Sequence, residues 1–549
     1  MTTLAFVILG IYTLALAYIT IYCVMQFNLL YHYKRTRTPD EKVKALLKEA
    51  GQEQLQPQLS SVEDETSAGR SLSQITVSPP ALKKVESNSA KGKNSRSDYE
   101  REFPMVTVQL PIYNEYFVIG RLIDAICQFD WPKDRFEIHI LDDSTDETVD
   151  VVAEKVSEYQ AKGFQIEQIR REKRQGFKAG ALRDGMSVAK GEFMAIFDAD
   201  FVPEPDFLQR TMPHFRDPEI GVVQTRWEHI NQDYSLITKL QAIQLNVHFT
   251  VEQKGREKGG HLLQFNGTAG IWRRAAIEAG GGWEADTITE DLDLSIRAQL
   301  AGYRITFLEE VGSPSELPVE MNSFKSQQHR WMKGGAETAR KMLPQVWGSD
   351  LPLAKKIYAT NHLLASTIFV FVFICGVFSV PLLYFLGDLI DYGISKNFFA
   401  VFLVGLLSII AIYYVANVQS PANREQSFGR SVFKFLVLFP LFLALSMGLS
   451  LHNTVAVVQG WLGKKSPFVR TPKFNIKNTA KQLQSGKYLT GKLNLITLGE
   501  GILCLYFMAA VAGAFYLQNT TFVVFHLLLA LGYGTIFFYS LKHLRYSRG

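Results

Sequence analysis

Six apolar stretches constrain this chain more than any other feature, because each is long enough to cross a lipid bilayer. The first extends from Leu4 to Tyr31 and contains no charged residue. The others cover about 358–386, 398–417, 432–452, 493–517 and 521–540. A water-soluble domain does not expose so many apolar runs, so we expect a multi-pass integral membrane protein. No basic residues precede the first run, which favours an uncleaved anchor over residues 1–33 rather than a signal peptide.

The remaining domain boundaries follow from changes in composition. We expect a polar and disordered cytoplasmic linker at 34–101, an α/β domain at 102–347, membrane helices at 348–463, a basic loop at 464–492, and a membrane hairpin with a basic tail at 493–549.

The membrane topology stays open at this point. The segment 464–492 carries eight Lys or Arg and no Asp or Glu, which favours a cytoplasmic location. Three spans between it and a cytoplasmic α/β domain would place it on the opposite side. Either 358–390 is a tight hairpin, or one run is re-entrant or interfacial, or the basic loop faces outward.

Charge and cysteine content exclude several classes of protein. The net charge of the 549 residues is only +5, so a nucleic-acid partner is not expected. The four cysteines form no CxxC pair and lack zinc-type spacing to histidine. A disulfide framework or a structural metal site is therefore not expected.

Three apolar, β-branched runs in the α/β region end in unusual polar residues. They are MVTVQLPIYNE, FEIHILDDSTDET and GEFMAIFDADFVPEP. Strands that alternate with helices predict a mostly parallel sheet, in which ligands bind at the carboxyl ends of the strands. The three polar ends therefore predict one shared site.

The acidic residues at these ends allow two interpretations each. Asp198 and Asp200 follow an apolar strand and could face a hard divalent cation, although DxD patterns also occur on ordinary surfaces. Asp143 could accept hydrogen bonds from a nucleotide, or the same segment could start a helix capped by Ser144 or Thr145.

Two further segments combine charge with small residues. Lys178 lies between glycines at an expected helix start and suits a phosphate, or it belongs to a solvated charged surface with Arg170–Arg174. Glu290 and Asp291 precede an amphipathic helix, where one carboxylate could act as a general base. The alternative is a capping box built on Thr289, with Asp293 the most expendable of these acids.

Two segments could bind a sugar or merely shape the chain. The stretch FNGTAGIWRR at 265–274 is a small-residue loop that lets backbone approach a ligand, or an ordinary turn. The segment KSQQHRWMKGG at 325–335 precedes the second apolar run. Its guanidinium and indole could mark the membrane interface or form the floor of an active site.

Taken in order, PxYNE, DDS, KAG, DAD, GTAG, TED and QxxRW resemble the inverting glycosyltransferase family 2. The arrangement is most similar to its membrane-embedded processive branch, which includes cellulose synthase and the cellulose-synthase-like mannan and glucan synthases. FVRTPK at 468–473 looks like the gating-loop motif of that branch. The resemblance covers Phe103 to Lys473 and implies a Rossmann-like GT-A domain fused to transmembrane helices.

The resemblance also implies roles for individual residues. The nucleotide-sugar would contact Pro111, Tyr113, Glu115, Asp143, Lys178 and Asp198. A Mg²⁺ or Mn²⁺ ion would bind Asp198 and Asp200. Asp291 would be the catalytic base, and Gln327 and Arg330 would hold the leaving diphosphate. The acceptor would contact Gly267, Thr268, Gly270, Glu290 and Trp331. The gating loop would include Phe468, Thr471 and Lys473.

The implied function is transfer of a hexose from UDP-glucose or GDP-mannose to the non-reducing end of a β-glycan, with export of the polymer. We also expect accessory export or regulatory subunits. The expected location is a bacterial inner membrane, with the catalytic domain in the cytoplasm. The alternatives are addition of a single sugar to a lipid, as by ceramide glucosyltransferase, and an inactive membrane scaffold.

Overall fold

The computed structural model describes residues 2–35, 101–395, 397–420, 427–465, 473 and 494–544. The chain divides into two compact units, one of Met1–Tyr33 with Phe103–Gly549 and the other of Lys34–Glu102. The fold and the site described below belong to the first unit.

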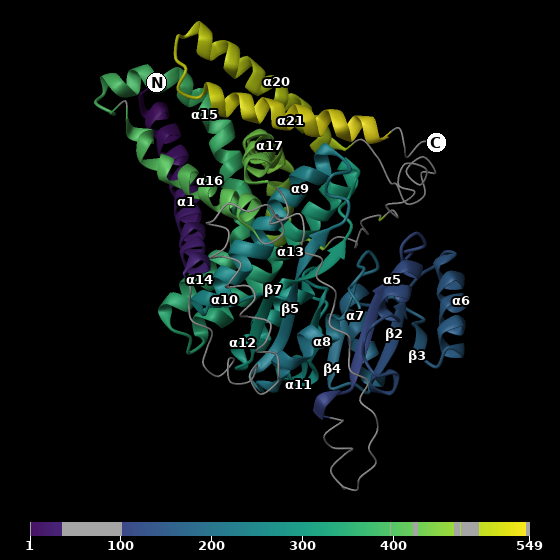
Figure 1. Ribbon diagram of the computed structural model, residues 1–549. Helices are drawn as coiled ribbons and strands as arrows, with labels where there is room; N and C mark the ends of the chain where they lie inside the picture. The colour runs from purple at the N-terminus through teal and green to yellow at the C-terminus, as the bar shows by residue number, and fades with distance from the viewer. Residues whose placement is uncertain are drawn as a thin grey trace, which may run out of the picture. The chain divides into compact units, whose positions relative to one another are not determined.

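A seven-stranded mixed sheet forms the centre of the α/β region (Figure 1). Its strands are β1 Val106–Ile112, β2 Phe136–Asp142, β3 Gln165–Arg170, β4 Phe193–Ile196, β5 Ile220–His229, β6 Gly270–Arg273 and β7 Arg304–Ser315. Their order across the sheet is β3-β2-β1-β4-β6-β5-β7. Only β6 is antiparallel to its neighbours β4 and β5. The mostly parallel sheet predicted from the sequence is therefore confirmed.

Helices cover both faces of this sheet. They are α5 Ile119–Ile126, α6 Thr148–Ala161, α7 Phe177–Val188, α8 Phe207–Thr211, α9 Leu236–Val247, α10 Gln253–Gly259, α11 Arg274–Ala279 and α12 Glu290–Leu300. The 3-10 segments η3 Lys133–Arg135 and η4 Met212–Arg216 and the π-helical turn η5 His248–Glu252 connect them.

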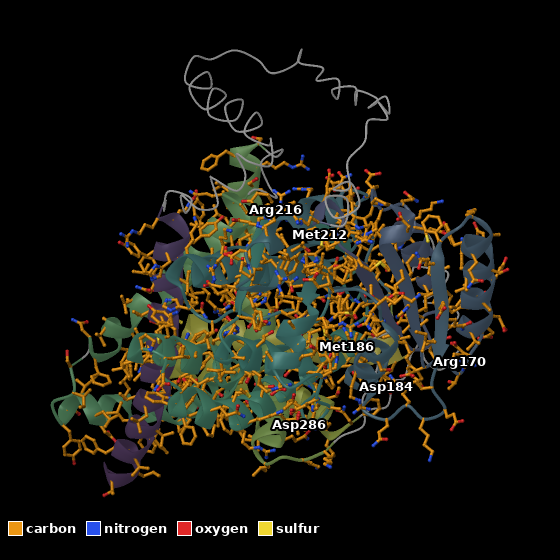
Figure 2. All side chains as sticks on the ribbon, turned by 90° about the horizontal axis from the view of Figure 1, so that it is seen from below. Arg170, Asp184, Met186, Met212, Arg216 and Asp286 are labelled. Carbon is orange, nitrogen blue, oxygen red and sulfur yellow. The ribbon has the colours of Figure 1, made fainter. Side chains whose placement is uncertain are left out.

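Alternation along the strands explains the two layers. In β4, Phe193 and Ala195 join the core that contains α5, whereas Met194 and Ile196 join the core that contains α7, α11 and α12. Successive side chains of a strand point to opposite faces, so a run of four apolar residues is buried on both sides. Side chains fill the space between sheet and helices (Figure 2).

The C-terminal part of the unit is helical. Its elements are α13 Met321–Gly348, α14 Leu353–Leu363, η6 Ala365–Thr367, α15 Ile368–Asp391, η7 Phe398–Phe402, α16 Leu403–Val418, α17 Phe428–Gly448, α18 Ser450–Trp461, α20 Leu495–Tyr516 and α21 Val523–Leu544. Together with α1 Thr2–Lys34, six helices in the described part of the chain are long and apolar enough to cross a membrane.

The structure divides two of the predicted apolar runs. The apolar run at 358–386 is not continuous, because α14 ends at Leu363 and the candidate span begins at Ala365. The run at 432–452 is also divided between α17 and α18. Phe435, Phe439 and Phe442 of α17 share one apolar cluster with residues of α9 and α13. This helix therefore packs against elements of the α/β region.

Candidate active site

One cavity lies beyond the carboxyl ends of the central strands, where the sequence predicts a site. The predicted residues that line it are Lys178, Asp198, Asp200, Gly267, Glu290, Asp291, Gln327, Arg330, Trp331 and Lys473. They come from α7, the turn after β4, the loop before β6, α12, α13 and the segment between α18 and α20. Segments far apart in the sequence thus converge on one small volume.

Asp198 is held by contacts on both sides. Its backbone N–H donates to Thr268 Oγ1 at 2.8 Å, and its Oδ1 lies 2.5 Å from Lys178 Nζ. The same ammonium donates to the carbonyl of Gly267 at 2.9 Å. Burial acts to lower the pKa of Lys178, but Asp198 and other carboxylates outweigh it and raise this pKa. Lys178 is therefore a fixed positive charge in the cavity.

Asp200 contacts the ammonium of a second lysine. Lys473 Nζ lies 2.7 Å from Asp200 Oδ2 and donates to the carbonyl of Glu316 at 2.7 Å. Arg121 pairs with Glu316 at 2.7 Å and donates to the carbonyl of Asp200 at 3.4 Å. Asp198 and Asp200 thus present carboxylate oxygens that already attract cations, and such hard oxygen donors suit Mg²⁺ or Mn²⁺.

The acidic pair Glu290 and Asp291 opens helix α12. Thr289 precedes it but makes no side-chain cap, since its hydroxyl contacts Thr338 Oγ1 at 2.9 Å, so the predicted capping box is wrong. Asp291 Oδ1 accepts from the N–H of Leu292 at 2.8 Å. Burial is the largest cause that raises the pKa of both carboxyls, and the charge of Asp291 raises that of Glu290 further. Elevated pKa values suit proton transfer near neutral pH.

Glycine at 267 has a specific reason in this site. Its φ is +81°, and a Cβ there would lie 3.0 Å from Asp291 Oδ2 and 3.6 Å from Lys178 Nζ. Any side chain would be strained and would crowd the cavity. Thr268 and Gly270 are instead buried behind it: Thr268 binds the Asp198 backbone, and Gly270 pairs with β4 and β5.

Helix α13 presents Gln327, Arg330 and Trp331 to the cavity from one face, since residues three and four apart are neighbours on a helix. Its N-terminus is capped by Glu320, whose carboxylate accepts from the N–H groups of Asn322 and Ser323. The charge of Arg330 also lowers the pKa of Asp291 against the larger effect of burial. Of the two interpretations of this segment, the structure supports the floor of a site.

A basic and aromatic cluster lies at the ends of β1 and β2. Arg171 binds Asp143 through two nitrogens at 2.9 and 2.5 Å, and Arg174 Nε lies 3.6 Å from the same carboxylate. The guanidinium of Arg174 stacks on the ring of Tyr113, 3.5 Å from its centroid. The side chain of Arg171 is only 11% exposed, whereas Arg170, Glu172 and Lys173 of the same run are exposed, so the run is a charged surface from which Arg171 turns toward Asp143.

The loops after β1 and β2 are tied together. Asn114, at φ +57°, donates its N–H to Ser144 Oγ at 2.9 Å, and its Oδ1 accepts from the N–H of Thr145 at 2.9 Å. Ser144 and Thr145 therefore do not cap α6, which begins at Thr148. Pro111 lies inside β1, and the carbonyl of Glu115 accepts two N–H groups at the start of α5. Phe468 and Thr471 lie outside the described residues.

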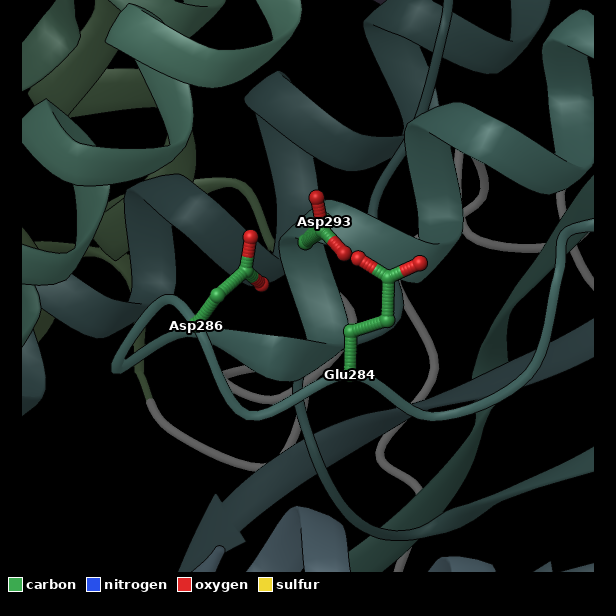
Figure 3. A group of neighbouring side chains, drawn as sticks. All are labelled: Glu284, Asp286 and Asp293. Atoms are coloured by element: carbon green, nitrogen blue, oxygen red, sulfur yellow. The ribbon is translucent and has the colours of Figure 1, made fainter.

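Glu284, Asp286 and Asp293 form an acidic group whose oxygens lie within 4.8 Å of one another (Figure 3). Lys341 Nζ occupies its centre, at 2.5, 2.9 and 3.0 Å from one oxygen of each. Arg297 adds a 2.6 Å contact to Asp293, which is fully buried. The cluster is thus an ion-pair network that fastens the loop before α12 to α13, and Asp293 is not expendable.

Several lining residues were not singled out from the sequence. Trp227 stacks on Phe249 with ring centroids 4.8 Å apart, and Asn266 contacts His248 at 2.7 Å. Trp227 is not part of a recognisable motif, so its place in the cavity could have been predicted only from the strand register. Two indoles, Trp227 and Trp331, therefore line the same cavity.

Comparison with known proteins agrees with this geometry. The model of Glycosyl transferase family 2 matches residues 107–280, which hold most of the sheet and the DAD segment. The mostly parallel sheet with helices on both faces is GT-A-like, as the sequence predicts.

The curated relatives include two plant enzymes. Over 262 residues the chain is 45% identical to Glucomannan 4-beta-mannosyltransferase 2 of Arabidopsis thaliana and 44% identical to Glucomannan 4-beta-mannosyltransferase 1 of Oryza sativa subsp. japonica. Each match covers 47% of this chain and 49% or 50% of the relative. The chain thus spans about half the length of these relatives. Because they are plant proteins, the bacterial membrane expected above stays a prediction.

Among solved structures, a mannosyltransferase from Pyrobaculum calidifontis in complex with GDP-Man and Mn²⁺ is similar at 19% identity and a TM-score of 0.44. The match covers 66% of this chain and 88% of that one.

Proposed function

We propose that this chain, whose residues 107–280 match the model of Glycosyl transferase family 2, is an inverting β-glycan synthase that transfers mannose from GDP-mannose. The observation that carries the proposal is the convergence of Lys178, Asp198, Asp291 and Arg330 on one cavity. The names of the relatives, glucomannan 4-beta-mannosyltransferases, support mannose as the transferred sugar, and GDP-mannose is the donor that we propose for it. UDP-glucose is the second donor to test.

The proposed reaction is a single displacement at the anomeric carbon. The acceptor hydroxyl oxygen attacks that carbon while a carboxylate oxygen of Asp291 takes its proton. The bond from the anomeric carbon to the phosphate oxygen breaks, and the diphosphate leaves with the electron pair. Attack on the face opposite the leaving group turns an α-linked donor into a β-linkage.

Charge in the cavity is arranged for this displacement. Lys178 and Arg330 supply positive charge where the diphosphate becomes more negative. Asp198 and Asp200 would hold the divalent cation, which when bound supplies further charge for the leaving group. Tyr113, with Asp143 and its arginine partners, would bind the nucleotide at the ends of β1 and β2.

The acceptor would lie between α12 and α13. An indole has a flat apolar face and a polar edge, which matches the apolar face of a sugar ring. Trp331 and Gln327 of α13 both line the cavity, where Trp331 would stack on the terminal sugar and Gln327 would contact the leaving group.

We further propose that the product leaves through the helical region. Asn453 of α18 and Gln328 of α13 are buried, with side-chain polar atoms that lack hydrogen-bond partners among the described residues. Unsatisfied amide groups in an apolar interior are costly, and contact with a hydroxyl-rich glycan would satisfy them once α13 and α18 part to admit it.

The packing of α17 bears on the topology. If α17 is the interfacial run, only α15 and α16 cross the membrane between the catalytic region and the basic loop at 464–492. The catalytic region and the basic loop would then both face the cytoplasm, in agreement with the positive-inside rule. The apolar cluster that α17 shares with α9 and α13 also contains residues of α16, and either helix as the interfacial run places the two segments on the same side of the membrane. The topology is tested with single cysteines introduced at position 464 or 351 and labelled from each side of sealed vesicles. Labelling of the two positions from opposite sides would contradict it.

The function is tested with the purified full-length chain in lipid bilayers, Mg²⁺ or Mn²⁺, and radiolabelled GDP-mannose or UDP-glucose. Products are sized and digested with linkage-specific β-mannanase and β-glucanase. A long polymer that β-mannanase degrades is the expected result. A lipid carrying one labelled sugar would replace the synthase with a single-addition transferase. No transfer from either donor would favour an inactive scaffold.

A further inference from the structure

The ammonium of Lys473 is positioned on the carboxylate proposed to bind the divalent cation. It lies 2.7 Å from Asp200 Oδ2, and the carbonyl of Glu316 accepts from it at the same distance. The Lys473 side chain is 12% exposed and the Asp200 side chain 11%. This contact is therefore buried in the cavity rather than a loose pair at the surface.

The two lysines that contact the DAD segment come from different parts of the chain. Lys178, which pairs with Asp198, belongs to α7 of the family 2 domain and is also held by the carbonyl of Gly267. Lys473 lies 273 residues after Asp200 in the sequence, between the helices α18 and α20. Among the described residues, the contact of Lys473 with Asp200 thus links one of the proposed metal carboxylates to the segment between α18 and α20.

An ammonium and a divalent cation cannot share this carboxylate without conflict. A Mg²⁺ or Mn²⁺ ion binds a carboxylate oxygen at about 2.0–2.2 Å. With Lys473 in its observed position, two centres of positive charge would face the same short carboxylate, and they would repel each other strongly in a cavity with little water.

We propose that Lys473 holds the cation position at Asp200 in the ligand-free protein, so that Lys473 and the divalent cation compete for this carboxylate. The inference rests on the proposed assignment of Asp198 and Asp200 as metal ligands. It makes metal binding dependent on a residue of the basic segment that follows α18. Lys473 is also held by the carbonyl of Glu316, whose side chain pairs with Arg121.

The test measures binding of Mn²⁺ without any nucleotide. Free Mn²⁺ is followed by electron paramagnetic resonance in titrations of the purified full-length chain in lipid nanodiscs. Lys473→Met is expected to bind Mn²⁺ about tenfold more tightly than the wild type, the factor appropriate to loss of one competing charged hydrogen bond. Lys473→Arg keeps the competing charge and is expected to match the wild type.

Two controls separate this effect from others. Lys465→Met removes a charge from an exposed position in the same basic segment and is expected to leave Mn²⁺ affinity unchanged. In an Asp200→Asn background, Lys473→Met is expected to give no gain. Equal or weaker Mn²⁺ binding by Lys473→Met in the wild-type background would overturn the proposal. The readout needs no turnover, so its failure is distinct from a failure of the donor assay.

Discussion

The buried ion pair of Lys325 and Glu500 gives the most quantitative prediction. Lys325 is on α13, two positions before Gln327, and Glu500 is on α20. Their nearest atoms are 2.7 Å apart, and their side chains are 5% and 0% exposed. Thr497 Oγ1 is a further partner of the ammonium at 3.4 Å. The pair therefore joins the helix that lines the cavity to the C-terminal helical hairpin.

Removing one partner leaves an uncompensated charge in an apolar interior. Lys325→Met and Glu500→Met are each expected to lower the free energy of unfolding by about 3–5 kcal/mol. The double variant leaves no buried charge and replaces both side chains with apolar ones of similar length. It is expected to lie within about 1 kcal/mol of the wild type, or above it.

The assay is chemical denaturation of the purified chain in detergent micelles, analysed as a double-mutant cycle. Lys434→Met is the control, because the Lys434–Asp233 pair is 3.6 Å long and its side chains are 38% and 65% exposed. That change is expected to cost at most about 1 kcal/mol. Single variants as mild as this control, or a double variant as unstable as the sum of both, would refute the reasoning.

Three further predictions concern the cavity. Burial raises the pKa of Asp291, so the acid limb of the kcat/KM profile is expected above the usual carboxylate range, with activity lost as pH falls. Trp331→Ala is expected to raise the KM for oligosaccharide acceptor about tenfold or more while donor binding, followed by calorimetry, stays unchanged. Arg171→Met leaves Asp143 without its bidentate partner and is expected to weaken donor binding by about tenfold, whereas acceptor KM stays constant.

The position of the site could be predicted from the sequence because two simple rules act together. Apolar β-branched runs such as the one before Asp198 become buried strands, and the carboxyl ends of parallel strands meet at one edge. Asp198 follows from this rule, whereas Asp291, in the first turn of α12, follows from the resemblance to family 2.

Long-range pairing could not be predicted in the same way. Arg171 lies in a charged run typical of a solvated surface, and only the register of β2 with β3 brings it to Asp143. Lys473 reaches Asp200 across 273 residues, a contact that no local pattern encodes. Glu500 lies within an apolar run, and its need for a cationic partner becomes visible only when α13 and α20 pack together.

Local alternatives were also decided by tertiary contacts. The sequence around Thr289 allows a capping box, but its hydroxyl contacts Thr338 of α13 instead. Asp293 is one helical turn before Arg297 and within reach of Lys341, so a position that looks dispensable becomes a buried member of an ion-pair network centred on Lys341.

The most direct test of the account is the anomeric configuration of the linkage formed from GDP-mannose, determined by NMR for the wild type and for Asp291→Asn. Asp150→Asn, at an exposed position of α6, is the matched control. We expect β-linked mannose from the wild type and the control, and a loss of at least about 100-fold in rate for Asp291→Asn. An α-linked product, or full activity without the Asp291 carboxylate, would contradict an inverting transfer with Asp291 as its base.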